Sequence, residues 1–448
     1  MNFQAIYIED TETSNQLCKG GLIIKAGSRS TRQPVHMMLL CDTSGSMEME
    51  DKLKSVQKSI TLLLSLLGSE DRISLITFAD ASKIVLSRAS PSAEDRAAIQ
   101  YRIDSLTPDG STNMSAGLLD SRSLVEPADS GRKQGIIMLT DGHANIGVMK
   151  EEGLVEIVRR IQTESPGVTL TCVAYGVDHN SELLTALAKT GGGAYNVVKN
   201  LEDVATVFGD ILGGLVSVSA QGVQVQLPPG AEANTPYRCE KDAAGMTTVY
   251  IGDIYADSET TILFRNHPSK GPLRVKGTDM ATLNPIDEIV QPVVAGLNQP
   301  ELKPIRITEL RQRTADILKE AATTFGSSMA ERIDVLMEEI KGDSSIDGHP
   351  LKPLLLEDLD EAKKIATKKV ARDQYATVEM AQHSAFLSMA KGLRSNTRHV
   401  PPNTPLQRSP ANFLSPFTTN TQAQYATVMR TASNQTEEDS QKQDEDYA

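Results

Sequence analysis

Oxygen-bearing side chains follow an apolar run near the amino-terminal end of this sequence. Residues 35–41 form the run, and Asp42, Ser44 and Ser46 come directly after it. Gly45 permits a tight turn, so one carboxylate and two hydroxyls can converge on one point. Hard oxygen ligands of this kind suit Mg²⁺. The pattern predicts a metal-binding turn at the carboxyl end of a buried strand, while a polar strand-to-helix turn without a metal explains the same residues.

Two later motifs narrow this choice. The sequence reads Asp-Gly-Ser-Thr-Asn at 109–113 and Leu-Thr-Asp-Gly at 139–142. Together with the first motif, and in this order, they resemble the metal-ion-dependent adhesion site of von Willebrand factor type A (VWA) domains. In that resemblance Thr112 lies in the threonine loop of the family, and Asp141 is its second aspartate.

The resemblance implies a ligand set for one Mg²⁺ or Mn²⁺ ion. Ser44, Ser46 and Thr112 would contact the metal through their hydroxyls, and Asp42 and Asp141 would hold it largely through water and hydrogen bonds. Two carboxylates roughly neutralise a divalent ion, so an electrophilic position remains open for a carboxylate from a partner. We therefore expect an adaptor or assembly module that binds an Asp or Glu residue of a protein partner.

Two other function classes remain open. In the first, the metal only stabilises the fold of a structural or assembly protein. In the second, the protein is a phosphatase of the haloacid-dehalogenase type, in which a second acid two residues after the first protonates the leaving group. Ser44 stands at that position and cannot do so, and His143 fits an exposed loop better than a catalytic role. We therefore expect no enzymatic activity.

The elements that position these residues alternate between strands and helices over 35–218, which is typical of a doubly wound, mostly parallel sheet. We expect strands at 35–41, 72–79, 135–140, 168–175 and 194–198, and helices at 53–67, 93–106, 114–125, 153–163, 181–189 and 201–215. Asp42 and Asp141 then leave the sheet at the same edge.

The rest of the chain differs in character. Period-two alternation over 219–304 predicts a small β-sandwich, and residues 1–34 form a strand segment that we expect to complete it. Residues 305–393 are predicted to form a helical hairpin, from helices over 305–341 and 354–393. Residues 394–448 are rich in Pro, Ser, Thr, Asn and Gln and end in acids, which predicts a disordered acidic tail.

Bulk properties limit the partners. The 448 residues carry a formal net charge of −13, which argues against nucleic acid or an anionic membrane as the main partner. No apolar run has the length of a membrane span, and residues 1–10 lack a cationic segment followed by an apolar one. Cys41 and Cys172 lie in apolar strands, as buried free thiols do. We therefore expect a cytoplasmic protein.

Overall fold

A computed structural model describes most of the chain and divides it into two compact units. The described residues are 1–8, 17–27, 32–127, 130–165, 167–176, 179–198, 201–268, 271–295, 302–321, 326–367, 393–394 and 424. The first unit combines residues 1–28 with 219–400, and the second combines 29–218 with 401–448.

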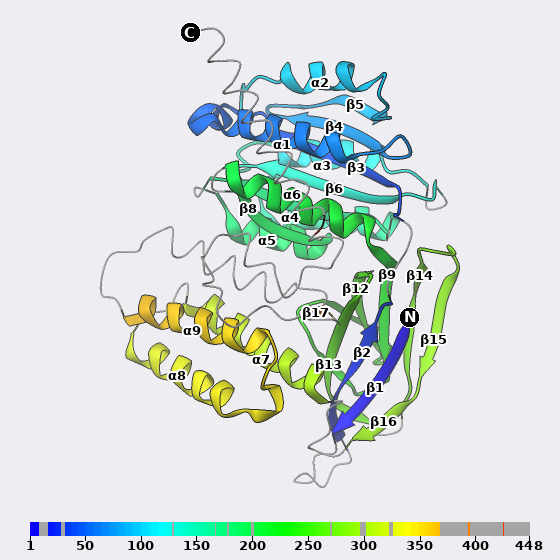
Figure 1. Cartoon of the computed structure of the whole chain (residues 1–448), viewed down its shortest axis with the longest axis vertical. Coiled ribbons are helices and arrows are strands. Elements are labelled where there is room, and N and C mark those ends of the chain that lie inside the picture. The colour runs from blue at the N-terminus through cyan, green and yellow to red at the C-terminus, as the bar shows by residue number, and fades with distance from the viewer. Residues whose placement is uncertain are drawn as a thin grey trace. The chain divides into compact units, whose positions relative to one another are not determined.

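A parallel sheet forms the centre of the second unit (Figure 1). Its described strands run in the order β5-β4-β3-β6-β7-β8, and only the β4–β5 pair is antiparallel. The bounds are β3 (Val35–Asp42), β4 (Arg72–Phe78), β5 (Ser82–Ala89), β6 (Lys133–Thr140), β7 (Thr169–Tyr175) and β8 (Gly192–Val198). Every residue of β3 and β6 is buried, as the apolar runs predict for central strands.

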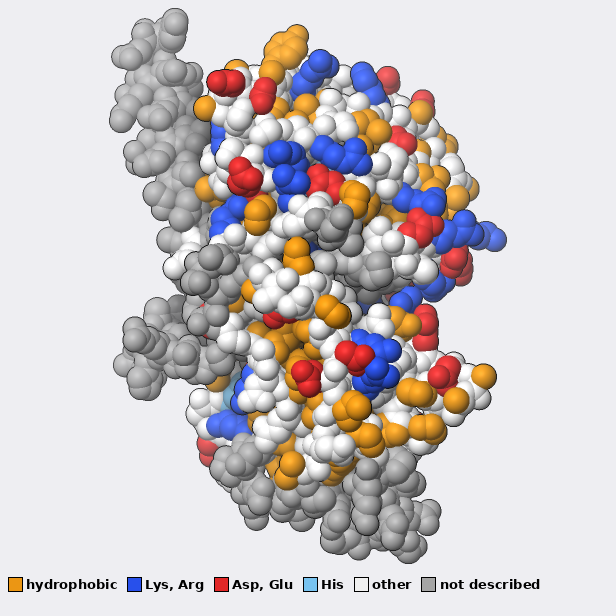
Figure 2. All heavy atoms as spheres, turned by 90° about the vertical axis from the view of Figure 1, so that its right-hand side faces the viewer, with side chains coloured by type: hydrophobic (Ala, Val, Ile, Leu, Met, Phe, Trp, Pro, Cys, Tyr) orange, Lys and Arg blue, Asp and Glu red, His pale blue; other side chains and the backbone are white. Residues whose placement is uncertain are grey.

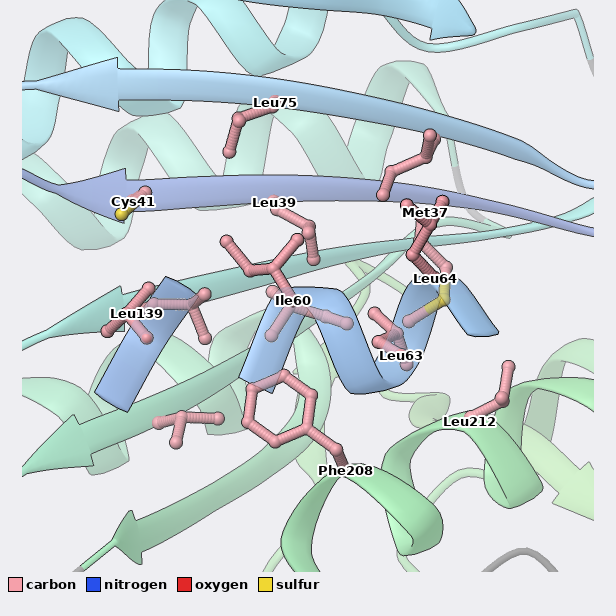
Figure 3. Packing of buried hydrophobic residues seen from close by; sticks show 14 of the residues in the cluster. Met37, Leu39, Cys41, Ile60, Leu63, Leu64, Leu75, Leu139, Phe208 and Leu212 are labelled. Carbon is pink, nitrogen blue, oxygen red and sulfur yellow. The ribbon is translucent and has the colours of Figure 1, made fainter. Parts of the chain in front are cut away.

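Helices cover both faces of this sheet, which confirms the predicted fold class. They are η1 (Gly45–Asp51), α1 (Lys52–Leu66), α2 (Arg96–Asp104), α3 (Met114–Ser123), α4 (Glu151–Glu164), α5 (Ser181–Thr190) and α6 (Leu201–Val216). Helices α1 and α6 pack together on one face, and α3, α4 and α5 lie on the other (Figure 1). Figure 3 shows Ile60 of α1 and Phe208 of α6 in the core beneath Leu39.

The antiparallel strand β5 has no counterpart among the predicted elements. Its residues are half-buried or exposed, and its register against β4 shifts between Ile73 and Ile76. An edge strand of this kind lacks the continuous apolar run that marks a central strand. Its sequence therefore carries a weak strand signal.

The first unit contains two packed sheets. One has the path β10-β13-β2-β1-β16, and the other runs β11-β12-β9-β14-β15. The bounds are β1 (Asn2–Ile8), β2 (Leu17–Lys25), β9 (Val218–Leu227), β10 (Glu232–Asn234), β11 (Arg238–Lys241), β12 (Thr247–Tyr255), β13 (Ser258–Pro268), β14 (Leu273–Asp279), β15 (Pro285–Val290) and β16 (Pro292–Ala295). Apolar side chains from both sheets, among them Ile24 and Val225, form one core. The strands β1 and β2 thus pair within a sheet built mostly from later residues.

The helical region differs from a two-helix hairpin. It contains three described helices, α7 (Lys303–Ala321), α8 (Ser327–Gly342) and α9 (Leu351–Thr367). The predicted first helix is interrupted before α8, where Gly326 has φ 125°, a conformation that ends a right-handed helix. Residues 368–392 of the predicted second helix lie outside the described residues, and Leu393–Arg394 is a short strand, β17, rather than helix.

Two further predictions concern the carboxyl-terminal tail and membrane-spanning segments. The predicted tail, 394–448, lies outside the described residues except for Arg394 and Gln424. Of the helices that the structure describes, none combines the length and apolar character that crossing a membrane requires.

Candidate functional site

The structure brings the predicted first and third motifs together at one edge of the sheet. Because β3 and β6 are neighbouring parallel strands, with Cys41 opposite Leu139, the segments that follow them leave side by side. Ser46 Oγ lies 3.1 Å from Ser44 Oγ and donates a hydrogen bond to Asp141 Oδ1 at 3.0 Å. The hydroxyl of Ser46 therefore contacts the second predicted aspartate directly, and the hydroxyl of Ser44 contacts Ser46.

The predicted threonine loop lies against the same turn. The Gly45 amide donates to the Gly110 carbonyl at 3.0 Å, and the Asp109 amide donates to the Thr43 carbonyl at 2.7 Å. Thr112 follows in this loop with only 3% of its surface exposed. Side chains of the first and third motifs thus lie together, and the loop that carries Thr112 lies against the first turn through backbone hydrogen bonds; Asp42, Ser44, Ser46, Thr112 and Asp141 are called the cluster below.

Asp42 is a buried carboxylate with few donors around it. Its Oδ1 accepts from the Ser44 amide at 2.9 Å, and its Oδ2 accepts from Thr140 Oγ1 at 2.6 Å. Burial raises the pKa of Asp42 to about 6, because removal from water penalises the charged form. Hydrogen bonds from the Ser44 side chain, the Thr140 hydroxyl and the Ser44 amide oppose this shift, and the nearby charge of Asp141 adds to it. A cation placed beside this carboxylate would relieve that cost.

Sequence analysis missed Asn145, which fixes the position of Thr112. The Thr112 amide donates to Asn145 Oδ1 at 2.7 Å, and the Asn145 amide donates back to the Thr112 carbonyl at 3.1 Å. The loop after Asp141 therefore holds the threonine loop through a reciprocal pair. Asn145 follows Asp141 by four residues, but a single polar loop residue gives no periodic signal that marks this role.

Lys52 was also missed, although it contacts a predicted ligand. Its Nζ donates to Asp141 Oδ2 at 3.0 Å, and the two side chains are 12% and 5% exposed. One oxygen of Asp141 therefore faces the hydroxyl of Ser46, and the other faces an ammonium group. The position of Lys52, at the first residue of α1, gave no hint of this contact.

The donor set of the cluster fits a hard divalent cation. Within the described part of the chain, no three His, Cys, Asp or Glu side chains gather in a way that could hold a metal ion, so a transition-metal site of that kind is not found there. The cluster instead offers hydroxyl and carboxylate oxygens, the ligands that Mg²⁺ and Mn²⁺ prefer. Ser46 is exposed whereas Asp42 and Ser44 are buried, so solvent reaches the cluster at Ser46. His143 is exposed in the loop that follows.

Comparisons with known proteins agree with this architecture. Residues 36–210 match the family model described as the von Willebrand factor type A domain. The chain therefore contains a VWA domain, formed by the parallel sheet and its helices. An uncharacterised protein of Escherichia coli (strain K12), YfbK, is 31% identical over 239 residues, which cover 51% of this chain and 41% of YfbK. The chain thus spans less than two thirds of the length of this curated relative.

Two solved structures share the fold over most of the chain. A von Willebrand factor type A protein from Catenulispora acidiphila superposes with a TM-score of 0.63 at 13% identity, covering 88% of this chain and 97% of that one. The ArnB paralog VWA2 from Sulfolobus acidocaldarius superposes with a TM-score of 0.55 at 14% identity, covering 82% and 93%. Similarity at this level of identity concerns the fold alone.

Proposed function

We propose that the cluster of Asp42, Ser44, Ser46, Thr112 and Asp141 is a metal-ion-dependent adhesion site that binds one Mg²⁺ or Mn²⁺ ion. The observation that supports this proposal is that Ser44 and Ser46 lie beside Asp42 and Asp141, with the loop of Thr112 bonded to the same turn. The carboxylate of Asp42 is buried, and none of its hydrogen-bond donors is a cation. A divalent ion would supply a balancing positive charge beside the carboxylate of Asp42.

In this proposal, different residues have different roles at the site. Ser44, Ser46 and Thr112 offer hydroxyl oxygens as direct ligands, while Asp42 and Asp141 supply the neutralising charge. The hydroxyl of Thr140 fixes the orientation of Asp42, and Asn145 holds the backbone of Thr112. When bound, the ion acts as a Lewis acid with a free coordination position, which suits a carboxylate oxygen.

The ligand in this proposal is an Asp or Glu side chain of a protein partner, and the protein acts as an adaptor or assembly module rather than as an enzyme. Ser44 stands where a phosphatase of the aspartate type needs a second acid, and a serine hydroxyl is poorly suited to protonate a leaving oxygen. On the face drawn in Figure 2, basic and acidic side chains are interspersed, which favours a local contact over a long-range field for a polyanion.

The proposal includes a location inside the cell. It is supported by Cys41 and Cys172, which are free and buried in strands of the sheet. Burial raises the pKa of the Cys172 thiol to about 12, so this thiol is poorly reactive. Such buried thiols suit a reducing compartment.

Calorimetric titration with Mg²⁺ and Mn²⁺ tests the metal site. We expect binding to the wild-type protein and at least a hundredfold loss in Asp42→Asn, on the order of 3 kcal/mol, because the ion loses a full counter-charge. Asp51→Asn is the matched control, since Asp51 is an exposed acid on the same segment and pairs with Lys54 instead. Equal metal affinity in the wild-type protein and Asp42→Asn would refute the site.

Capture of partners from cell extract, with Mg²⁺ or with EDTA, tests the adhesion role. Partners that are retained only with Mg²⁺, and lost in Asp42→Asn, would support recognition through the metal. A partner set unchanged by EDTA, despite metal binding in calorimetry, would instead favour a metal that only stabilises the fold.

A further inference from the structure

Lys52 reaches the candidate metal site from an unusual stretch of backbone. It is the first residue of α1 and follows Glu50 (φ 55°, ψ 27°) and Asp51 (φ 53°, ψ 29°). Two successive residues other than glycine in the left-handed region cost free energy, and such conformations persist where the surrounding structure enforces them. The turn directs the Lys52 side chain back toward the sheet edge, where Nζ lies 3.0 Å from Asp141 Oδ2.

The surroundings of Lys52 set it apart from the other lysines of this helix. Its side chain is 12% exposed and its partner 5% exposed. Lys54 also forms an ion pair, with Asp51 at 2.8 Å, but there the side chains are 73% and 70% exposed. Ion pairs on the surface are screened by water and salt, whereas a pair withdrawn from water acts on its neighbours at much closer to full strength.

The geometry leaves room for Lys52 and a metal ion on opposite oxygens of one carboxylate. Asp141 Oδ1 accepts from Ser46, one of the proposed hydroxyl ligands, while Oδ2 accepts from Lys52. An ion held by the hydroxyl cluster would therefore lie on the Oδ1 side. Lys52 can stay in place when the ion binds, and its charge then adds to that of the site.

We infer that Lys52 makes the loaded site cationic, so that it weakens metal binding and strengthens the binding of an anionic ligand. The charges of Asp42, Asp141 and a divalent ion sum to zero, and the ammonium of Lys52 brings the total to one positive charge. Glu48, Glu50 and Asp51, the acids on η1, are exposed and their fields are screened. This inference rests on the proposed metal site and names a residue that determines its preference for carboxylates.

Removing the positive charge of Lys52 should raise the affinity for the metal ion and lower the affinity for an anionic ligand. Lys52→Met keeps an unbranched side chain that is one atom shorter and uncharged. Because the removed charge lies a few ångströms from the site, we expect Mn²⁺ to bind about tenfold more tightly. Lys52→Arg keeps the charge and should stay within about threefold of the wild-type protein. Lys54→Met is the matched control, because it removes an exposed charge two residues away on the same helix. Thermal unfolding of each variant would verify that it is folded.

Fluoroacetate serves as the carboxylate probe, followed by the ¹⁹F relaxation that bound Mn²⁺ induces. We expect its affinity for the Mn²⁺-loaded protein to fall about tenfold in Lys52→Met and to stay unchanged in Lys54→Met. Fluoroacetamide, which has the same shape without the charge, should show no difference between the variants. Raising the salt concentration should weaken fluoroacetate binding more in the wild-type protein than in Lys52→Met.

The outcomes separate this inference from the proposed function. Tighter Mn²⁺ and weaker fluoroacetate binding in Lys52→Met would support both. Unchanged affinities in Lys52→Met, with metal binding to the wild-type protein, would overturn the role of Lys52 and leave the metal site intact. Binding of Mn²⁺ to Lys52→Met alone would refute both the metal site in the natural chain and a cationic loaded site there. Absence of binding in every variant would overturn both.

Discussion

Two aspartates buried at opposite ends of the parallel sheet have contrasting surroundings. Asp71 precedes β4 at the amino end, and Asp42 ends β3 at the carboxyl end; both are 0% exposed. Asp71 accepts two hydrogen bonds from Arg32, at 2.8 and 2.7 Å, and two more from the amides of Val35 and Gly68. Asp42 accepts from the Ser44 amide, the Thr140 hydroxyl and the Ser44 side chain, and no cationic side chain is among these donors.

This difference separates a structural carboxylate from a candidate ligand. The charge of Asp71 is balanced inside the fold by a guanidinium and by backbone donors, so nothing further needs to bind it. Asp42 keeps a charge that burial penalises, and its neighbours are hydroxyls that can themselves turn toward a cation. Burial alone therefore does not identify a site, whereas burial without a balancing charge does.

The largest expected effect follows from removing the charge of Asp71, the buried carboxylate that pairs with Arg32. Asp71→Asn leaves the guanidinium of Arg32 without its counter-charge, so we expect the free energy of unfolding to fall by about 2–4 kcal/mol. The lower part of that range reflects the 33% exposure of the Arg32 side chain. Urea denaturation in EDTA measures the change, and metal affinity should stay within about twofold of wild type.

Asp42→Asn gives the contrast within the same experiment. The raised pKa of Asp42 means that its neutral form is favoured in the fold, so this stabilising contribution is present at low pH and lost as the pH rises through about 6. At pH 7.5 in EDTA, the wild-type protein bears the cost that Asn removes, and Asp42→Asn should be the more stable protein. A loss of stability in both variants would contradict the distinction between the two ends.

The second expected effect is a pH dependence from the amino end. His36 is 0% exposed. Its Nε2 lies 2.9 Å from Ser74 Oγ, and its Nδ1 lies 3.7 Å from Glu126 Oε1. Burial lowers the pKa of His36 to about 4, although Glu126 opposes this shift. The unfolded chain binds the proton near pH 6.5 and the fold does not, so the contribution of His36 to stability is full above that pH and falls by roughly 3 kcal/mol down to about pH 4.

Comparison with His36→Gln isolates this effect. The variant should lose stability less steeply between pH 6.5 and 4 than the wild-type protein, because Gln does not titrate. His143→Gln, which changes an exposed histidine in the loop after Asp141, is the control and should follow the wild-type curve. Parallel curves for His36→Gln and the wild-type protein would show that the charge of His36 is accommodated in the fold.

The contrast also explains which features the sequence could predict. The central strands were predictable because continuous apolar runs such as 35–41 mark strands buried on both faces. Asp42, Ser44 and Ser46 were predictable because polar residues directly after such a run must lie at the edge of the sheet. Strand β5 was not, because an edge strand lacks that run.

Side-chain pairs between residues far apart in the chain could not be predicted from the sequence. Lys52 reaches Asp141 across 89 positions of the chain, and Arg32 reaches Asp71 across 39. No spacing rule relates such residues, since the fold alone brings them together. The break before α8 was hidden for another reason. Apolar residues recur at helical spacing in both α7 and α8, so the hydrophobic pattern gave no sign that α7 ends at Ala321 and that Gly326, with φ 125°, precedes α8.

The smallest expected effect concerns backbone strain, which both ends of the sheet contain. Glu50 (φ 55°) precedes Lys52 at the carboxyl end of the sheet, near the candidate site. Arg88 (φ 47°) lies in β5 at the amino end. Arg88 is held by hydrogen bonds from its amide to Ser74 Oγ and from its guanidinium to backbone carbonyls, whereas the side chain of Glu50 is exposed.

Glu50→Gly should therefore raise the free energy of unfolding by about 0.5–1 kcal/mol. Glycine relieves the left-handed strain, and its greater freedom in the unfolded chain offsets only part of this gain. Arg88→Gly relieves similar strain but deletes the guanidinium contacts, so stability should fall. Urea denaturation of both variants compares the two ends directly. A fall in stability for Glu50→Gly as well would mean that the Glu50 side chain contributes more to the turn than its exposure indicates.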